Sequence, residues 1–151
     1  MVQNLCKAVI LLEEADLIGN LEPINSHISA PNYFLNFPQE ALSIIDEVEK
    51  LTGKNRLVYQ CDFFHLQVQH GNITRFLENN IDKIGHIQIA QVPGRNEPDT
   101  DGELNYSFLF QTLQRYNLEK PYSSYKYNDS DLDIMATLAS NMLHLGRLRM
   151  A

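Results

Sequence analysis

The chain has 151 residues, of which 44% are hydrophobic and 21% are charged, and these proportions suit one globular domain with a single core. A formal net charge of -7 and a pI near 5.1 argue against a nucleic-acid partner, because phosphate recognition needs clustered lysine and arginine. The two cysteines, Cys6 and Cys61, lack a metal-type spacing, and the apolar run at 8–12 is too short to span a bilayer, so we expect a cytoplasmic protein with no membrane partner.

The first third of the chain predicts a helix, a strand and a second helix. Apolar residues recur at spacings of three and four over 3–16, which indicates a helix. A short strand is expected over 21–25. A second helix is expected over 38–53, because Pro38 suits a first helical turn and Gly53 suits a C-terminal cap.

The middle of the chain contains the clearest strand. Residues 56–65 are dense in apolar and aromatic side chains, as expected of a strand that is buried on both faces. A third helix is expected over 71–85, with Asn72 as its N-cap. A third strand over 86–91 and a fourth helix over 105–117 follow.

Short links join these alternating helices and strands. Such alternation is typical of right-handed parallel crossovers and predicts an α/β fold built from parallel βα repeats. An open doubly wound sheet and a part of an eight-stranded barrel share the pattern, and periodicity alone does not separate them. No glycine-rich phosphate loop follows any of the predicted strands, which weakens a nucleotide-binding interpretation.

Polar side chains stand at the carboxyl end of the predicted strands or just beyond it: Glu22, Asp62, His65, Gln88, Arg95 and Glu97. In a parallel barrel such positions face one common mouth, where the chemistry of that fold takes place. The two carboxylates and the amide offer hard oxygen ligands, which suit Mg²⁺ or Mn²⁺ better than zinc or copper. We therefore expect Glu22, Asp62 and Gln88 to converge on a divalent ion.

Each of these residues also has a purely structural interpretation. Glu22 precedes a proline and could simply end a strand at the surface. Asp62 could cap a helix and His65 could be a core histidine. A glutamine such as Gln88 usually only hydrogen-bonds its neighbours in a strand.

Four segments of the chain form a specific pattern: LEPIN at 21–25, YFLNFPQEALSIIDEV at 33–48, QCDFFHLQVQHGN at 60–72, and PGRNEP followed by GELNY within 85–106. With these segments, residues 2–118 resemble the hydroxypyruvate isomerase family, a branch of the xylose isomerase-like TIM barrels. This resemblance implies the C-terminal half of a (β/α)8 barrel. It also implies an enzyme that interconverts hydroxypyruvate and tartronate semialdehyde by shifting a carbonyl between adjacent carbons.

The same resemblance implies roles for the polar residues. Glu22 is a metal ligand and one of two catalytic carboxylates, and Asp62 and Gln88 are further ligands of Mg²⁺ or Mn²⁺. The ion would stabilise the enediolate while the carboxylates move the proton. The substrate, a small carboxylated carbonyl compound, would be bound by three residues: His65, Arg95 and Glu97. The arginine would grip its carboxylate with two parallel hydrogen bonds, oriented by the glutamate.

Two features depart from the family's pattern. Only three strands are counted before residue 118, whereas a complete barrel has eight in roughly 250 residues, so we expect an incomplete barrel over 1–128 with two unpaired sheet edges. The segment 120–131 contains no glutamate where the family's last strand carries the second catalytic one. Residues 129–151 are expected to form a divergent amphipathic helix.

Three functional classes follow from these observations. The first is an isomerase of the hydroxypyruvate type. The second is an inactive remnant that still binds a small carbonyl ligand. The third is a half-barrel that becomes competent in a homodimer or with a complementing half-barrel. We expect this chain alone to be weakly active or inactive.

Overall fold

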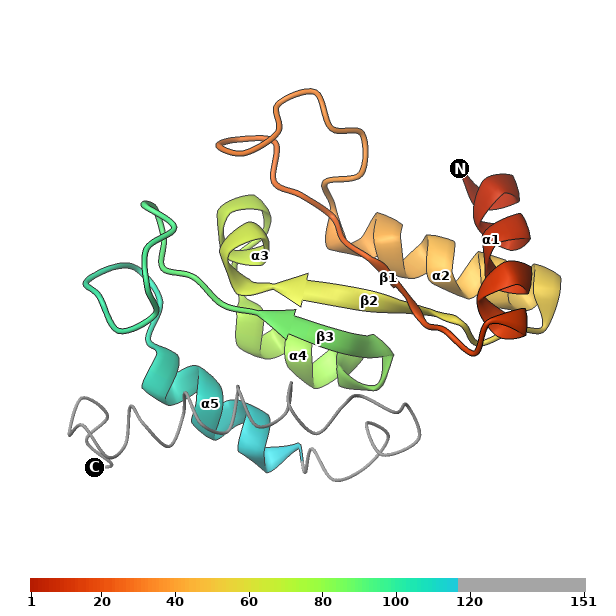
Figure 1. Cartoon of the computed structure of the whole chain (residues 1–151). Helices are drawn as coiled ribbons and strands as arrows, with labels where there is room; N and C mark the ends of the chain where they lie inside the picture. The colour runs from red at the N-terminus through yellow and green to blue at the C-terminus, as the bar shows by residue number, and fades with distance from the viewer. Residues whose placement is uncertain (117–151) are drawn as a thin grey trace.

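The computed structural model describes residues 1–116, which form a three-stranded parallel sheet flanked by helices (Figure 1). The elements follow in the order α1 (Val2–Glu14), β1 (Gly19–Leu21), α2 (Pro38–Thr52), β2 (Leu57–Asp62), α3 (Phe63–Gln69), α4 (Ile73–Asn80), the 3₁₀ turn η1 (Ile81–Lys83), β3 (Ile84–Gln88) and α5 (Tyr106–Arg115). The α/β fold with parallel strands is therefore as predicted.

The strands lie in the order β1-β2-β3, and both pairs are parallel. Leu21 of β1 pairs with Tyr59 of β2, and Asp62 of β2 pairs with Gln88 of β3. Because all three strands run the same way, their carboxyl ends meet at one edge of the sheet. The register therefore brings Glu22, Asp62 and Gln88 to the same rim.

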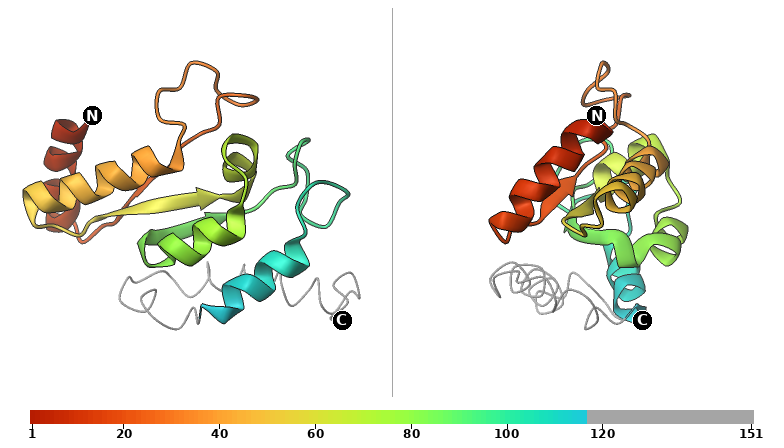
Figure 2. Two further views of the ribbon diagram at one scale, coloured as in Figure 1. Left: turned by 180° about the vertical axis from the view of Figure 1, so that it is seen from behind. Right: turned by 90° about the vertical axis from the view of Figure 1, so that its right-hand side faces the viewer.

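Helices α2 and α4 cover one face of the sheet (Figure 2), and their apolar stripes form the core with the inner side chains of β2. The ring of Tyr59 meets that of Phe76 on α4, with 5.3 Å between the ring centroids. Among the side chains that are hidden from solvent, Phe63 and Leu77 each contribute roughly 1.5–3 kcal/mol through burial. Side chains alternate along a strand, so Gln60 and Asp62 fall on the face of β2 opposite Tyr59.

Helix α5 fixes the segment that leaves β3. The hydroxyl of Tyr106, at the start of α5, donates to the carbonyl of Ala90 at 2.7 Å and accepts from the N–H of the same residue at 2.9 Å. The ring of Tyr106 also stacks on Phe63, with 6.4 Å between the ring centroids. The loop between β3 and α5 is thus held at both ends.

All three strands end earlier than predicted. The strand expected over 21–25 is observed as β1, which ends at Leu21. The chain leaves the sheet at Glu22 because Pro23 has no N–H to donate to the ladder. The strand expected over 56–65 ends at Asp62, whose side chain caps helix α3. The third strand, predicted over 86–91, begins at Ile84 and ends at Gln88.

Three predicted helices, now α1, α2 and α5, start and end within two residues of the observed bounds, but the helix predicted over 71–85 ends at Asn80, and α3 was not predicted. Pro38 occupies the first turn of α2, and Gly53 ends it in the left-handed conformation with φ 66°. Asn72 is the N-cap of α4, although its φ of 52° is left-handed and its side chain makes no capping hydrogen bond.

Two predictions lie outside the described residues. They concern the segment 120–131 that lacks a glutamate and the helix expected over 129–151. Within residues 1–116, no helix has both the length and the apolar character needed to cross a membrane.

Candidate metal and substrate site

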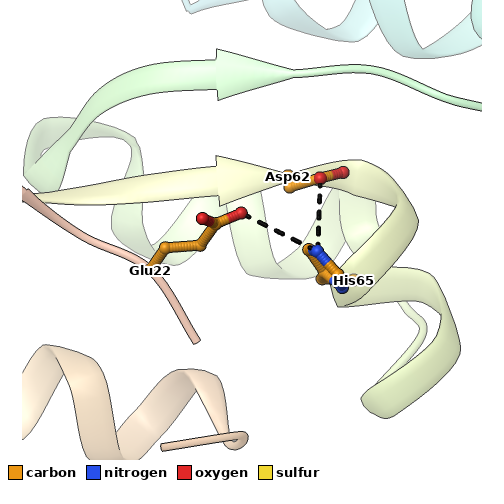
Figure 3. A group of neighbouring side chains, drawn as sticks. All are labelled: Glu22, Asp62 and His65. Carbon is orange, nitrogen blue, oxygen red and sulfur yellow. Dashed lines mark ion pairs between the residues drawn. The ribbon is translucent and has the colours of Figure 1, made fainter. Parts of the chain in front are cut away.

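Three of the predicted site residues meet at the carboxyl rim of the sheet (Figure 3). Glu22 directly follows β1, Asp62 ends β2, and His65 lies on the first turn of α3. The Nε2 atom of His65 is 3.9 Å from Glu22 Oε1 and 3.6 Å from Asp62 Oδ2. One potential ligand atom from each residue lies within 4.8 Å of the others.

The two oxygens of Asp62 have different partners. Oδ1 accepts the N–H of Phe64 at 2.8 Å and caps α3. Oδ2 accepts from Arg95 Nη2 at 3.0 Å and faces His65. The structural and the functional interpretations of Asp62 are therefore compatible, because one carboxylate serves both.

Glu22 lies in a partly buried position close to another carboxylate. Burial raises the pKa of Glu22 above its usual value, a hydrogen bond from Gln60 lowers it, the charge of Asp62 raises it, and the charge of Arg95 lowers it. Two carboxylates held this close repel each other unless a cation lies between or beside them. Their chemistry therefore fits a hard divalent ion.

The imidazole of His65 is buried between these groups. Burial lowers the pKa of His65, the negative charge of Asp62 raises it, and the positive charge of Arg95 lowers it again. The net direction is downward, which favours the neutral form of the ring.

Arg95 reaches the site from the loop after β3. Besides its bond to Asp62, its guanidinium carbon lies 5.0 Å from the centroid of the Phe64 ring. Its backbone takes the left-handed φ of 57°, and its N–H donates to the carbonyl of Gln91 at 2.8 Å. Asp62 and Phe64 thus orient Arg95. The sequence suggested Glu97 for this orienting role. Glu97 is exposed on the same loop, and its role in substrate binding stays a prediction.

Gln88 reaches the cluster through another side chain. It is exposed at the end of β3, and its Oε1 accepts from Gln60 Nε2 at 3.0 Å. Gln60 also lowers the pKa of Glu22, so its side chain lies between Gln88 and that carboxylate. The role of Gln88 as a direct metal ligand stays a prediction.

Sequence reasoning missed two residues of this site, Gln60 and Asn25. Gln60 had a usable signal, since it stands two positions before Asp62 and therefore on the same face of a strand. Asn25 had none. It lies in the irregular segment after β1, and only the fold brings its buried amide to His65, 40 positions away.

The residues present fit the donor set of a divalent metal site. Glu22 and Asp62 would hold the ion as carboxylate ligands, and the sequence suggests the amide oxygen of Gln88 as a further donor. Carboxylate and amide oxygens are ligands that Mg²⁺ and Mn²⁺ accept.

Comparisons with known proteins agree with the family resemblance. Residues 1–145 match the family model described as xylose isomerase-like TIM barrel. The chain is 40% identical over 114 residues to the hydroxypyruvate isomerase of Escherichia coli, an alignment that covers 76% of this chain and 42% of that protein. A Xenopus laevis protein that carries the same name provisionally is 47% identical over 113 residues, covering 75% of this chain and 40% of that protein.

A solved structure also resembles the fold. The crystal structure of an AP endonuclease, family 2, from Brucella melitensis superposes with a TM-score of 0.69 at 32% identity, covering 77% of this chain and 43% of that chain. The chain spans 40–42% of the length of the curated relatives described above.

Proposed function

The chain belongs to the xylose isomerase-like TIM barrel family, and on that premise we propose that it carries the metal and substrate site of an isomerase for small carboxylated carbonyl compounds. The reaction that we propose is the interconversion of hydroxypyruvate and tartronate semialdehyde. The observation that carries the proposal is the convergence of Glu22, Asp62 and His65 at the rim of a parallel sheet, beside Arg95.

The substrate carboxylate would bind Arg95. A guanidinium has several N–H donors arranged as a fork, so its single bond to Asp62 leaves donors for a second carboxylate. The contact with the Phe64 ring restricts the guanidinium to one face of the site. This restriction would place the substrate carbonyl toward Glu22 and His65.

Glu22 would move the proton between the two adjacent carbons. A carboxylate suits this task, because it can take a proton from one carbon and return it to the next. His65 would contact the substrate oxygen through Nε2. A divalent ion, when bound, supplies the positive charge that polarises the carbonyl and stabilises the developing negative charge.

A second candidate function is that of a binding or pairing half-barrel. Among the described residues, β1 and β3 each pair with β2 alone, so the outer edge of each has no strand beside it. The segment 120–131 contains no glutamate to act as the second acid. We propose on these grounds that the chain alone turns over substrate weakly or not at all, and gains activity when paired.

An assay with a mass measurement tests both candidates. The 151-residue chain is incubated with hydroxypyruvate and Mg²⁺, Mn²⁺ or EDTA, and its mass is measured by light scattering under the same conditions. The wild type is compared with Glu22→Gln and with Glu47→Gln, a matched change at an exposed position of α2.

Each outcome points to one class. Metal-dependent turnover that Glu22→Gln abolishes and Glu47→Gln preserves supports the isomerase. Turnover confined to a dimer supports the pairing form, while a monomer without turnover supports the inactive remnant. Robust turnover by a verified monomer would show the expected weak activity to be wrong. Turnover that ignores both Glu22→Gln and EDTA would overturn the proposed chemistry.

A further inference from the structure

We infer that Asn25 fixes the proton of His65 on Nε2, so that His65 serves the site as a hydrogen-bond donor and is excluded as a metal ligand. Asn25 is thus a positioning residue that acts through His65. The assignment of the proton stands on geometry alone, and its consequence for substrate binding rests on the proposed function.

Two donors of Asn25 point at the same ring nitrogen. The side-chain Nδ2 of Asn25 lies 2.7 Å from His65 Nδ1, and the backbone N–H of Asn25 points at that nitrogen from 3.4 Å. Asn25 is fully buried, with an exposed fraction of 0%, so water does not replace either contact.

The orientation of the Asn25 amide is itself determined by its surroundings. Oδ1 accepts the backbone N–H of Ile28 at 2.9 Å and that of Ser29 at 3.1 Å. Turning the amide over would set its NH₂ group against these two donors. The NH₂ group therefore faces His65, and it also donates to Ser29 Oγ at 3.2 Å.

A nitrogen that faces two donors must carry a lone pair. A proton on His65 Nδ1 would meet the N–H groups of Asn25, so the neutral ring carries its proton on Nε2. That nitrogen faces Glu22 Oε1 and Asp62 Oδ2 at 3.9 and 3.6 Å. The N–H is thus directed into the cluster, toward oxygen atoms.

This arrangement decides which atoms of the cluster can bind a cation. A histidine nitrogen coordinates a metal only through a lone pair, and it usually needs an acceptor on its other nitrogen. Asn25 supplies donors there instead. Although Glu22, Asp62 and His65 lie close enough to form a three-residue metal site, only the two carboxylates remain as ligands among them. The site therefore favours hard, oxygen-binding cations, and His65 is kept for a substrate oxygen.

The wild-type proton position is measured directly. Two-bond ¹H–¹⁵N correlation spectra of the ¹⁵N-histidine-labelled full chain, recorded without metal at alkaline pH, report which ring nitrogen is protonated. The signals of His65 are identified by their loss in His65→Gln. We expect the Nε2-protonated form. A ring protonated on Nδ1 would overturn the inference.

The variant Asn25→Asp is designed to reverse the arrangement. The carboxylate keeps an oxygen for the N–H groups of Ile28 and Ser29 but presents an acceptor to His65 Nδ1. We expect the ring proton to move to Nδ1 and the affinity for Zn²⁺, which binds imidazole well, to rise by about tenfold or more, with little change for Mg²⁺. The matched control Ser29→Ala removes one partner of the Asn25 amide and should leave the tautomer unchanged.

The outcomes separate this inference from the proposed function. If the wild-type ring is protonated on Nε2 and Asn25→Asp moves the proton, the inference holds even when the chain shows no turnover. If Asn25→Asp leaves the proton on Nε2, or Ser29→Ala moves it, Asn25 does not set the tautomer and the inference fails. If Asn25→Asp does not fold, the wild-type spectrum still decides.

Discussion

Asp62 joins the stability of the fold to the chemistry of the site. Its exposed fraction is only 4%, and a buried carboxylate needs partners for both oxygens. The N–H of Phe64 serves one oxygen, and Arg95 serves the other. The side chain of Asp62 therefore caps α3 at the end of β2, and it also holds the guanidinium of Arg95, which we assign to substrate binding.

Replacing Asp62 in two ways separates these tasks. Asp62→Asn keeps an oxygen for the N–H of Phe64 but presents an NH₂ group to Arg95, whereas Asp62→Ala removes the cap as well. We expect Asp62→Ala to lower the free energy of unfolding by about 1 kcal/mol more than Asp62→Asn, as measured by urea denaturation. Asn105→Ala, which removes the cap of α5, is the matched control away from the site. Equal losses for the two Asp62 variants would show that the cap contributes nothing.

Glu22 should make the protein less stable as its carboxyl ionises. Because the folded state raises the pKa of Glu22, chiefly by burial, its contribution to stability is present at acid pH and is lost as pH rises through the folded-state pKa. We expect the stability of Glu22→Gln relative to the wild type to increase from pH 4 to pH 7, in unfolding experiments with EDTA.

Glu13 provides a control, because its contribution to stability should change with pH in the opposite direction. Its pKa is lowered, first by the hydrogen bond from Lys54, against a smaller opposing effect of burial. Its contribution to stability is therefore present above the unfolded-state pKa and lost on acidification, so Glu13→Gln should lose stability relative to the wild type from pH 4 to pH 7. A difference for Glu22→Gln that stays flat with pH would contradict the assigned environment of Glu22.

The loop between β3 and α5 is held by the side chain of Gln91. Its Nε2 donates to the carbonyl of Leu104 at 2.9 Å, and its Oε1 accepts the N–H of Leu104 at 2.8 Å. A Cβ atom on Gly102 would lie 2.4 Å from Gln91 Cδ, so only glycine lets the loop pack this closely. The backbone carbonyl of Gln91 in turn accepts the N–H of Arg95, which fixes the position of the Arg95 backbone.

Removing the Gln91 amide should loosen this loop. Gln91 has an exposed fraction of 2%, so Gln91→Ala leaves buried backbone groups without partners and should cost about 2 kcal/mol or more of unfolding free energy. Hydrogen exchange at the Leu104 amide should also accelerate. The exposed Gln114→Ala on α5 should change the stability by less than about 0.5 kcal/mol. A loss for Gln91→Ala no greater than for Gln114→Ala would refute the role of Gln91.

Helices α1, α2 and α5 could be predicted from the sequence, whereas α3 was missed and the helix predicted over 71–85 ran into β3. Apolar spacing, Pro38 and Gly53 define α2 in the sequence and in the structure alike. The ends of β1 and β2 could not be predicted, because Pro23 and the cap by Asp62 break apolar patterns that continue in the sequence. Polar residues at strand ends could be predicted as a group. Their partners, such as Asn25, depend on a loop conformation that no periodicity encodes.

At the scale of the whole molecule, the two ends of the sheet have separate tasks. Near the amino ends of β1 and β2, the side chains of Lys54 and Arg56 pair with Glu13 at 2.9 and 3.4 Å. The carboxyl ends carry the site. This division is usual for parallel barrels, in which residues at the amino face serve stability and those at the carboxyl face serve chemistry.

The central claim is that Glu22 and Asp62 together hold a divalent cation, and a Mn²⁺ titration of the 151-residue chain tests it most directly. Electron paramagnetic resonance reports the loss of the free Mn²⁺ signal on binding. We predict binding to the wild type and to the exposed-site control Glu47→Gln, and a loss of affinity of at least about tenfold in Glu22→Gln and in Asp62→Asn. No binding to the wild type, or binding that neither site variant weakens, would contradict the account.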